Sequence, residues 1–120
     1  MSYDSNNIFA KILRGEIPCK KVYEDEHVLA FHDIAPQAPS HILVLPKGPY
    51  RDMNDFTATA GADEIAGLFR AVGKVAKEQG LDEAGYRVIS NCGANGGQEV
   101  PHLHLHILGG RRLGRMVQAA

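Results

Sequence analysis

Residues 102–108, near the C-terminal end of the chain, read His-Leu-His-Leu-His-Ile-Leu. Successive side chains of a β-strand point to opposite faces, so this alternation predicts a strand with imidazoles on one face and aliphatic side chains on the other. The aliphatic face requires a hydrophobic core to pack against. Three of the six histidines in the chain fall within five positions, so a face that is merely polar is a poor explanation. We therefore expect a half-buried strand that carries a histidine cluster.

The rest of the sequence predicts four more strands and two helices. Apolar residues at helical spacing predict a short helix over residues 4–14 and a longer one over 62–79. Short apolar segments between turn signals predict strands, which we place at 22–24, 28–32, 41–45 and 86–90, and the histidine strand itself spans 100–108. Few helices separate the strands, so the expected class is α+β, with a five-stranded mostly antiparallel sheet and two helices. The length predicts one domain, residues 1–120.

Charge and hydropathy exclude several classes of partner. The chain has 13 basic and 14 acidic residues, and neither half is basic enough to predict binding to a nucleic acid duplex. The longest purely aliphatic run is residues 42–45, far short of the roughly 20 residues of a membrane helix. The first seven residues are polar, and the two cysteines lie outside any C-x-x-C motif. We therefore expect a cytoplasmic protein with reduced thiols and no membrane association.

A structural zinc site is one interpretation of the histidine cluster. Two histidines at alternate positions of a strand can reach one zinc ion. A straight strand separates the starting points of His102 and His106 by about 13 Å, because each residue rises about 3.3 Å. The cluster contains no Cys, Asp or Glu that replaces the third ligand. We therefore expect no metal and no cofactor, and we keep a zinc-binding protein as an alternative.

A catalytic cluster is the interpretation that we favour. Imidazole has an ordinary pKa near 6.5, so its neutral form is available at pH 7, and charged neighbours favour that form. His104 lies between two such neighbours, so it is the best candidate for a nucleophile, with His102 and His106 to orient it or to handle protons. A phospho-imidazole is stable enough to form and reactive enough to hydrolyse. The glycine-rich segment 91–98 is a plausible cradle of backbone amides for the phosphate.

Together with other segments, this cluster resembles the signature of the histidine triad (HIT) superfamily, in particular its Hint branch of histidine triad nucleotide-binding proteins. The resemblance extends over almost the whole chain, and separate motifs agree in order and spacing. The matching segments are Ile8-Phe9-Ala10-Lys11-Ile12, Glu16-Ile17-Pro18, Phe31-His32-Asp33-Ile34, Pro36-Gln37-Ala38-Pro39-Ser40-His41, Gly96-Gly97-Gln98 and the histidine cluster itself.

This resemblance implies a purine nucleoside phosphoramidate hydrolase. Such an enzyme forms a covalent nucleotidyl-histidine and releases an amine and a nucleoside monophosphate, AMP or GMP. By this resemblance His104 is the nucleophile, and His102 and His106 assist it. His41 is a fourth catalytic histidine, farther from the reacting atoms, and its alternative role is that of a hydrogen-bonded core histidine.

The resemblance also implies which residues bind the purine nucleotide. Asp33 holds the ribose hydroxyls, since a carboxylate only accepts hydrogen bonds, and its alternative role is to cap a turn. The expected walls of the base pocket are Ile8, Phe9, Ile12, Phe31, His32, Ile34 and Leu43. The expected contacts to phosphate or ribose are Asn91, Gln98 and the backbone around Glu99 and Val100. Some relatives have Ser or Thr at position 99, and a carboxylate there should repel the phosphate, so we expect the Glu99 side chain to turn away.

The assembly implied by the resemblance is a homodimer in which the sheet extends across the interface. The longer helix and the strand that begins near Tyr86 are the expected contact surfaces. Two alternative functions stay open at this point: a nucleotide-binding regulatory or scaffold protein with vestigial activity, and a dinucleoside polyphosphate hydrolase of the same superfamily.

Overall fold

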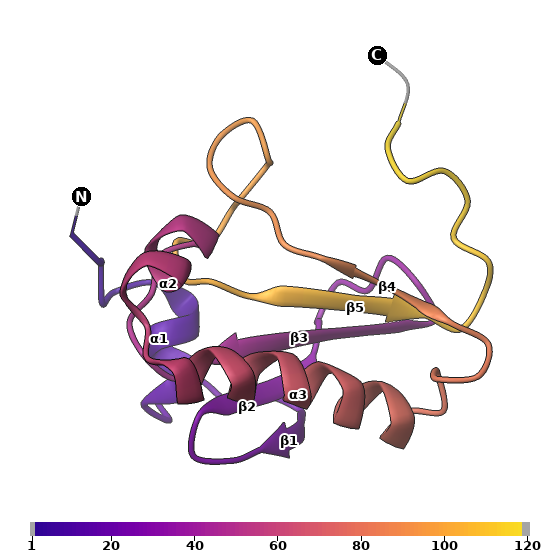
Figure 1. The fold of residues 1–120 in the computed structure, drawn as a ribbon, viewed down its shortest axis with the longest axis horizontal. Coiled ribbons are helices and arrows are strands. Elements are labelled where there is room, and N and C mark those ends of the chain that lie inside the picture. The colour runs from indigo at the N-terminus through magenta and orange to yellow at the C-terminus, as the bar shows by residue number, and fades with distance from the viewer. Residues whose placement is uncertain (1, 119–120) are drawn as a thin grey trace.

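One antiparallel sheet forms the frame of the molecule (Figure 1), in a computed structural model that describes residues 2–118. Its strands follow the order β1-β2-β3-β5-β4 across the sheet. The strands are β1 Lys21–Glu24, β2 Val28–His32, β3 Ser40–Pro46, β4 Tyr86–Ile89 and β5 Leu105–Gly109, and the helices are α1 Ile8–Leu13, α2 Met53–Thr59 and α3 Ala62–Glu78. The predicted α+β class and five-stranded sheet are confirmed.

Helix α3 lies across one face of the sheet (Figure 1). Its apolar stripe is buried against β2, β3 and β5, and the alternate residues Leu103, Leu105 and Ile107 belong to the same hydrophobic cluster. Full burial of each such side chain contributes about 1.5–3 kcal/mol. Gly80 follows the helix with a φ of 71°, as its position after the periodic stripe predicts. Within residues 2–118, no helix combines the length and the apolar character that crossing a membrane requires.

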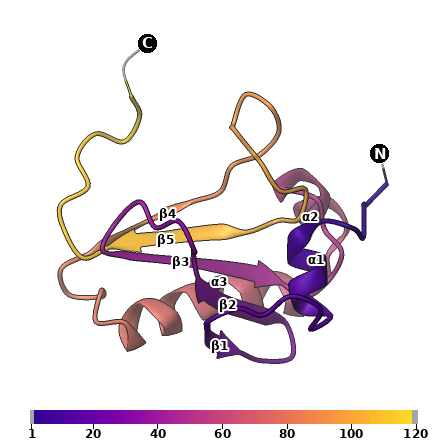
Figure 2. The same cartoon turned by 180° about the vertical axis from the view of Figure 1, so that it is seen from behind.

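The opposite face of the sheet is covered only at one end, by α1 (Figure 2). Phe9 packs there against a second apolar cluster that includes Phe31 and Leu43. Leu43 pairs with His106 across β3 and β5, and directly paired residues share a face. The histidine face of β5 is therefore the face that α3 leaves uncovered.

Two helical features differ from the sequence-based expectation. The structure has a third helix, α2, which is too short to show a periodic stripe and buries only Phe56. Its start is set by Asp52, whose side chain accepts a hydrogen bond from the Asp55 N–H at 2.8 Å. Helix α1 begins at Ile8 rather than at residue 4, because the Asn7 side chain caps it by accepting from the Ala10 N–H at 2.9 Å.

Strand β5 begins at Leu105 rather than at residue 100. Pro101 has no N–H to donate to a ladder, and the Leu103 N–H donates to the Tyr50 carbonyl instead of to β3. The last residue of β3, Pro46, also lacks an N–H. The predicted strand is therefore wrong in its first half, and of the three histidines only His106 belongs to a strand.

Candidate active site

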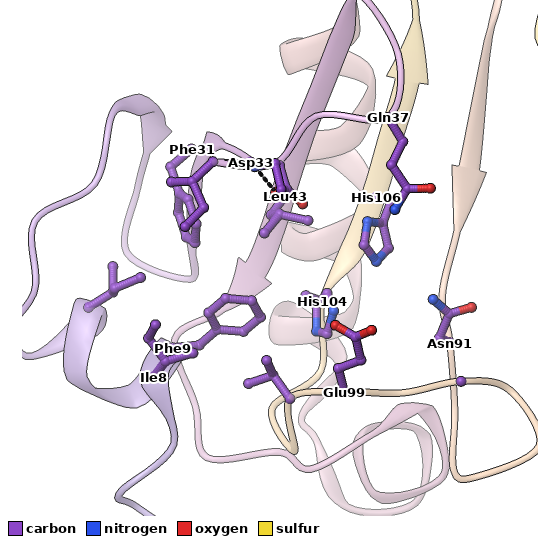
Figure 3. A pocket seen from close by; sticks show the side chains of 15 residues that line it. Ile8, Phe9, Phe31, Asp33, Gln37, Leu43, Asn91, Glu99, His104 and His106 are labelled. Atoms are coloured by element: carbon purple, nitrogen blue, oxygen red, sulfur yellow. Dashed lines mark hydrogen bonds between the residues drawn. The ribbon is translucent and has the colours of Figure 1, made fainter.

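The uncovered face contains a cavity of about 370 Å³ between α1, the loop that follows β2, and the entry to β5, which is a typical size for a small-ligand site. Figure 3 shows apolar side chains on one side of His104 and polar side chains on the other. The apolar lining residues are Ile8, Phe9, Ile12, Phe31, Ile34, Ala35, Leu43, Gly97 and Val100, and the polar ones are Asp33, Gln37, Asn91, Glu99, His104 and His106. One site therefore joins two chemically different halves.

Two of the residues expected to bind nucleotide lie outside this cavity. His32 lines a neighbouring groove with Pro18 and Cys19, because successive residues of β2 point to opposite faces and Phe31 already faces the cavity. Gln98 is also absent from the cavity wall. All the other residues expected in the base pocket, and Asp33, Asn91, Glu99 and Val100, line it.

The Gln98 side chain holds the glycine-rich loop in place. Its Oε1 accepts from the Gly93 N–H at 3.0 Å, and its Nε2 donates to the carbonyls of Arg51 and Val100. The Gly97 N–H donates within the same loop, so these amides do not converge on an anion. The N–H groups of Glu99 and Val100 donate to no atom of residues 2–118, which leaves them for a ligand.

His104 has one nitrogen bound and one exposed to the cavity. Its Nδ1 lies 2.7 Å from the His102 carbonyl oxygen, and a carbonyl only accepts, so the proton is on Nδ1. The Nε2 atom then carries the lone pair and has no hydrogen-bond partner within residues 2–118. Phe9 packs edge-on against the ring, with centroids 4.8 Å apart. The arrangement presents a neutral imidazole as a nucleophile at the border of the two halves.

His102 acts on His104 through its backbone and not through its ring. The ring is fully buried, with Nε2 donating to the Pro46 carbonyl at 2.9 Å and Nδ1 accepting from the Tyr3 hydroxyl at 2.5 Å. Both ring nitrogens are therefore occupied away from the cavity. His102 anchors the carbonyl that orients His104.

His106 receives its orientation from β3 and from the loop before it. The Gln37 N–H donates to His41 Nδ1 at 3.0 Å, which places the His41 proton on Nε2. His41 Nε2 donates in turn to His106 Nδ1 at 2.9 Å, so the His106 proton is on Nε2. That atom is buried and has no hydrogen-bond partner within residues 2–118. The chain of bonds presents one N–H donor to the polar half of the cavity.

Sequence reasoning did not single out Gln37, although it lies in the Pro-Gln-Ala-Pro-Ser-His segment quoted above. Its backbone N–H reaches a side chain four residues ahead. A backbone donor has no residue-type signal, so only the loop geometry identifies it.

Burial keeps the three imidazoles neutral. It lowers the pKa of His102 to about 4, with a smaller contribution from His104. It also lowers the pKa of His106 to about 4, assisted by His104 and His41. Burial lowers the pKa of His104 as well, although Asp33 and Glu99 oppose that shift. At pH 7 the lone pair on His104 is therefore available.

Asp33 caps a turn, the alternative role that its sequence position suggested, and it also lines the cavity. Its Oδ1 accepts from the Ala35 N–H at 2.8 Å, which caps the turn after β2. Its Oδ2 lies 3.4 Å from His41 Nε2, and the carboxylate also lines the cavity. The turn bond uses one lone pair, so acceptor capacity remains for a ligand.

Asp33, His41 and His106 place three possible metal-ligating atoms within 4.8 Å of one another. Ligation through His41 Nε2 requires its lone pair, which moves the proton to Nδ1. That proton then meets the Gln37 N–H, only 3.0 Å away between nitrogens. These residues fit a metal only if the Gln37 bond breaks.

Glu99 differs from the sequence-based expectation. Its carboxylate does not turn away but lines the polar half of the cavity and reaches toward His104 (Figure 3). No hydrogen bond or ion pair within residues 2–118 holds it elsewhere. Because the neighbouring glycine-rich loop is held by Gln98, the position of Glu99 is set by backbone that the sequence alone does not place.

Known proteins agree with this fold over nearly its whole length. The HIT domain matches residues 14–113. A histidine triad protein from Clostridium difficile superimposes with a TM-score of 0.87 at 48% identity, covering 97% of this chain and all of that one. A HIT family hydrolase from Legionella pneumophila gives 0.83 at 45% identity, covering 91% and 96%. The chain belongs to the HIT domain family.

Two relatives are similar to this chain over nearly their whole length, and one of them is named for an enzymatic activity. The purine nucleoside phosphoramidase of Escherichia coli is 46% identical over 110 residues, 92% of each chain. An uncharacterized 13.2 kDa HIT-like protein of Azospirillum brasilense is 68% identical over 116 residues, 97% of this chain and 95% of that protein.

Proposed function

We propose that this protein is a hydrolase of purine nucleoside phosphoramidates that acts through a nucleotidyl-His104 intermediate. The observation that carries the proposal is the oriented lone pair of His104 Nε2, at the border between an apolar and a polar half-cavity. The Escherichia coli phosphoramidase and the Legionella pneumophila hydrolase support the class of reaction.

The two halves suit the two ends of a nucleotide. A purine ring suits the apolar half, where Phe9 and Phe31 lie edge-on to one another at 5.8 Å. Asp33 accepts from the ribose hydroxyls. The N–H groups of Glu99 and Val100 contact the phosphate oxygens, which places phosphorus beside His104.

The reaction then follows in two displacements. The His104 Nε2 lone pair forms a bond to phosphorus while the bond between phosphorus and the amine nitrogen breaks. The amine nitrogen takes that electron pair and one proton from solvent, while the N–H of His106 Nε2 donates a hydrogen bond to a phosphate oxygen. Water then attacks phosphorus and loses one proton to solvent, and the bond to His104 breaks to release the nucleoside monophosphate.

Cavity charge favours a phosphoramidate over a dinucleoside polyphosphate. The charged side chains that line the cavity are the carboxylates of Asp33 and Glu99, and none of the fifteen described lining residues is Lys or Arg. A nucleoside phosphoramidate brings one negative charge at phosphorus, whereas a polyphosphate chain brings several. Each added anionic group meets uncompensated repulsion at the carboxylates.

The test is to incubate the protein with a fluorogenic adenosine phosphoramidate and, separately, with diadenosine tetraphosphate. We expect turnover of the phosphoramidate and, in samples quenched during turnover, an adenylyl adduct on His104 by peptide mass spectrometry. Faster turnover of the tetraphosphate identifies the polyphosphate hydrolase instead. Binding of AMP without turnover of either compound identifies a regulatory protein.

We also propose a homodimer with the sheet continued through β4. This strand is the edge of the sheet next to β5, and open edges are usually covered or paired. The apolar side chains of Tyr86 and Val88 in β4 are exposed by 38% and 42%, and that of Phe69 in α3 by 51%. Sedimentation equilibrium distinguishes a 26 kDa dimer from the 13.0 kDa chain, and Val88→Lys should shift the equilibrium toward monomer.

A further inference from the structure

Glu99 is an uncompensated negative charge beside the nucleophile. Its carboxylate lines the cavity and forms no ion pair within residues 2–118. Asp33, the other carboxylate there, already accepts from the Ala35 N–H and lies near His41. Glu99 is therefore the carboxylate that is free to bind a cationic group of a ligand.

The substrate portion nearest Glu99 follows from the division of the cavity. Ile8, Phe9, Phe31 and Leu43 lie on one side of His104, and Glu99 and Asn91 lie on the other (Figure 3). A nucleoside that fills the apolar side, with phosphorus at His104, directs its remaining substituent to the polar side. In a phosphoramidate that substituent is the amine.

We propose that Glu99 selects the leaving group by charge, and that the preferred substrates are nucleoside phosphoramidates whose amine portion carries an additional positive charge. This inference rests on the proposed phosphoramidase function. The added ammonium or guanidinium group lies a few bonds from the scissile nitrogen and takes no part in bond making. It forms a charge-assisted hydrogen bond with Glu99, and a carboxylate in the same place is repelled.

The expected size of the preference is modest. Glu99 is exposed, and exposed ion pairs are weakened by water and salt. We expect each step from anionic to neutral to cationic amine to raise kcat/KM by about threefold to fivefold at low ionic strength. Addition of 0.5 M salt should reduce the preference, because the added ions shorten the Debye length and screen the attraction between Glu99 and the cationic group.

Three adenosine phosphoramidates of similar length test the assignment: those of n-butylamine, 1,3-diaminopropane and β-alanine. Their kcat/KM values are measured for wild type, for Glu99→Gln and for Glu83→Gln, a control in the loop before β4. In wild type and Glu83→Gln we expect the order diamine, butylamine, β-alanine. In Glu99→Gln we expect the three values to converge within twofold, and in Glu99→Lys we expect the order to reverse.

Ratios of kcat/KM between the three substrates, taken for one enzyme variant at a time, separate this role of Glu99 from an effect on His104. Because Glu99 also raises the pKa of His104, its removal can change all three rates together, but such a change cancels in the ratios. An unchanged order in Glu99→Gln overturns the assignment while leaving the phosphoramidase function in place, as does turnover of all three compounds at one rate by wild type. No turnover of the butylamine compound overturns the proposed function, and the assignment with it.

Discussion

Two histidines that are two residues apart depend on different parts of the molecule. His104 lies in the irregular segment before β5 and is oriented by the carbonyl of His102, within its own chain segment. His106 lies in β5 and is oriented by His41, 65 residues away in sequence, and by the loop at Gln37. The comparison teaches that the proposed nucleophile, His104, is oriented locally, whereas the hydrogen-bond donor His106 is oriented by tertiary structure.

Burial follows the same division. The His102 ring that anchors the first segment is fully buried, between Tyr3 and Pro46. His106 is only partly buried, and its Nε2 has no hydrogen-bond partner in the part of the chain that the structure describes. The irregular segment before β5 therefore contributes a rigid support, and β5 contributes an N–H that is left to bind a ligand.

The largest expected effect comes from removal of the proposed nucleophile. His104→Ala should lower kcat by about 10⁴-fold or more, because the covalent route is lost. AMP binding should largely survive, since the apolar half and Asp33 are unchanged. Steady-state kinetics and calorimetric titration measure the two effects, and His27→Ala, outside the cavity, is the matched control. Residual turnover within tenfold of wild type contradicts the assigned nucleophile.

Acid should lower the free energy of unfolding, because it protonates the buried His102 ring that anchors the segment before β5. Unfolded His102 has a pKa near 6.5, whereas its folded pKa is about 4, so the unfolded state binds more protons between these values. The stabilisation is complete above pH 6.5 and falls as pH drops toward 4, by about 3 kcal/mol in all. Urea unfolding from pH 7.5 to 4 measures the loss. His102→Gln should lose less stability over that range, and identical profiles refute the explanation.

Asp33→Asn should separate ribose binding from turn capping. Asparagine keeps the Oδ1 acceptor for the Ala35 N–H but loses the charge, so ribonucleotide binding should weaken by roughly tenfold to a hundredfold with little change in Tm. Binding of 2′,3′-dideoxy-AMP should barely change, because it has no hydroxyls to lose. Calorimetric titrations with AMP and the dideoxy analogue provide the comparison. Equal losses for both ligands leave Asp33 as a structural residue only.

His41→Leu should disturb the orientation of His106 in β5 and leave His104 unaffected. Without the His41 N–H donor, the proton on His106 is no longer held on Nε2, and kcat should fall by about tenfold while KM stays nearly constant. His41→Gln, whose amide also donates, should restore part of the rate. A purely structural role predicts that both variants lose rate in proportion to their loss of Tm.

Chelation should have the smallest effect. The Gln37 bond opposes ligation by His41, so dialysis against EDTA should leave turnover within twofold. The measurement is kcat before and after dialysis, with metal content determined alongside. If dialysis removes the activity and stoichiometric zinc restores it, the prediction is wrong and the cluster is a metal site.

The sequence by itself determined the frame. Alternation at residues 102–108 placed Leu103, Leu105 and Ile107 in the core, and the helical stripe gave α3 to within one residue. Strand β2 matches its predicted span of 28–32. These features depend on the period of side chains along the backbone, about 2 residues for a strand and 3.6 for a helix. That period is visible in the sequence of any sufficiently long apolar segment.

Only the tertiary structure decided which partners the site residues have. Tyr3 meets His102 across 99 residues, and Pro46 meets it across 56. Gln98 turns to the loop, Glu99 turns to the cavity, and β5 begins five residues later than the sequence pattern predicts. Residue type fixes which bonds a side chain is able to make. The bonds that actually form depend on which distant segment folding brings within about 3 Å of the side chain. A local pattern of residues contains no information about that distance.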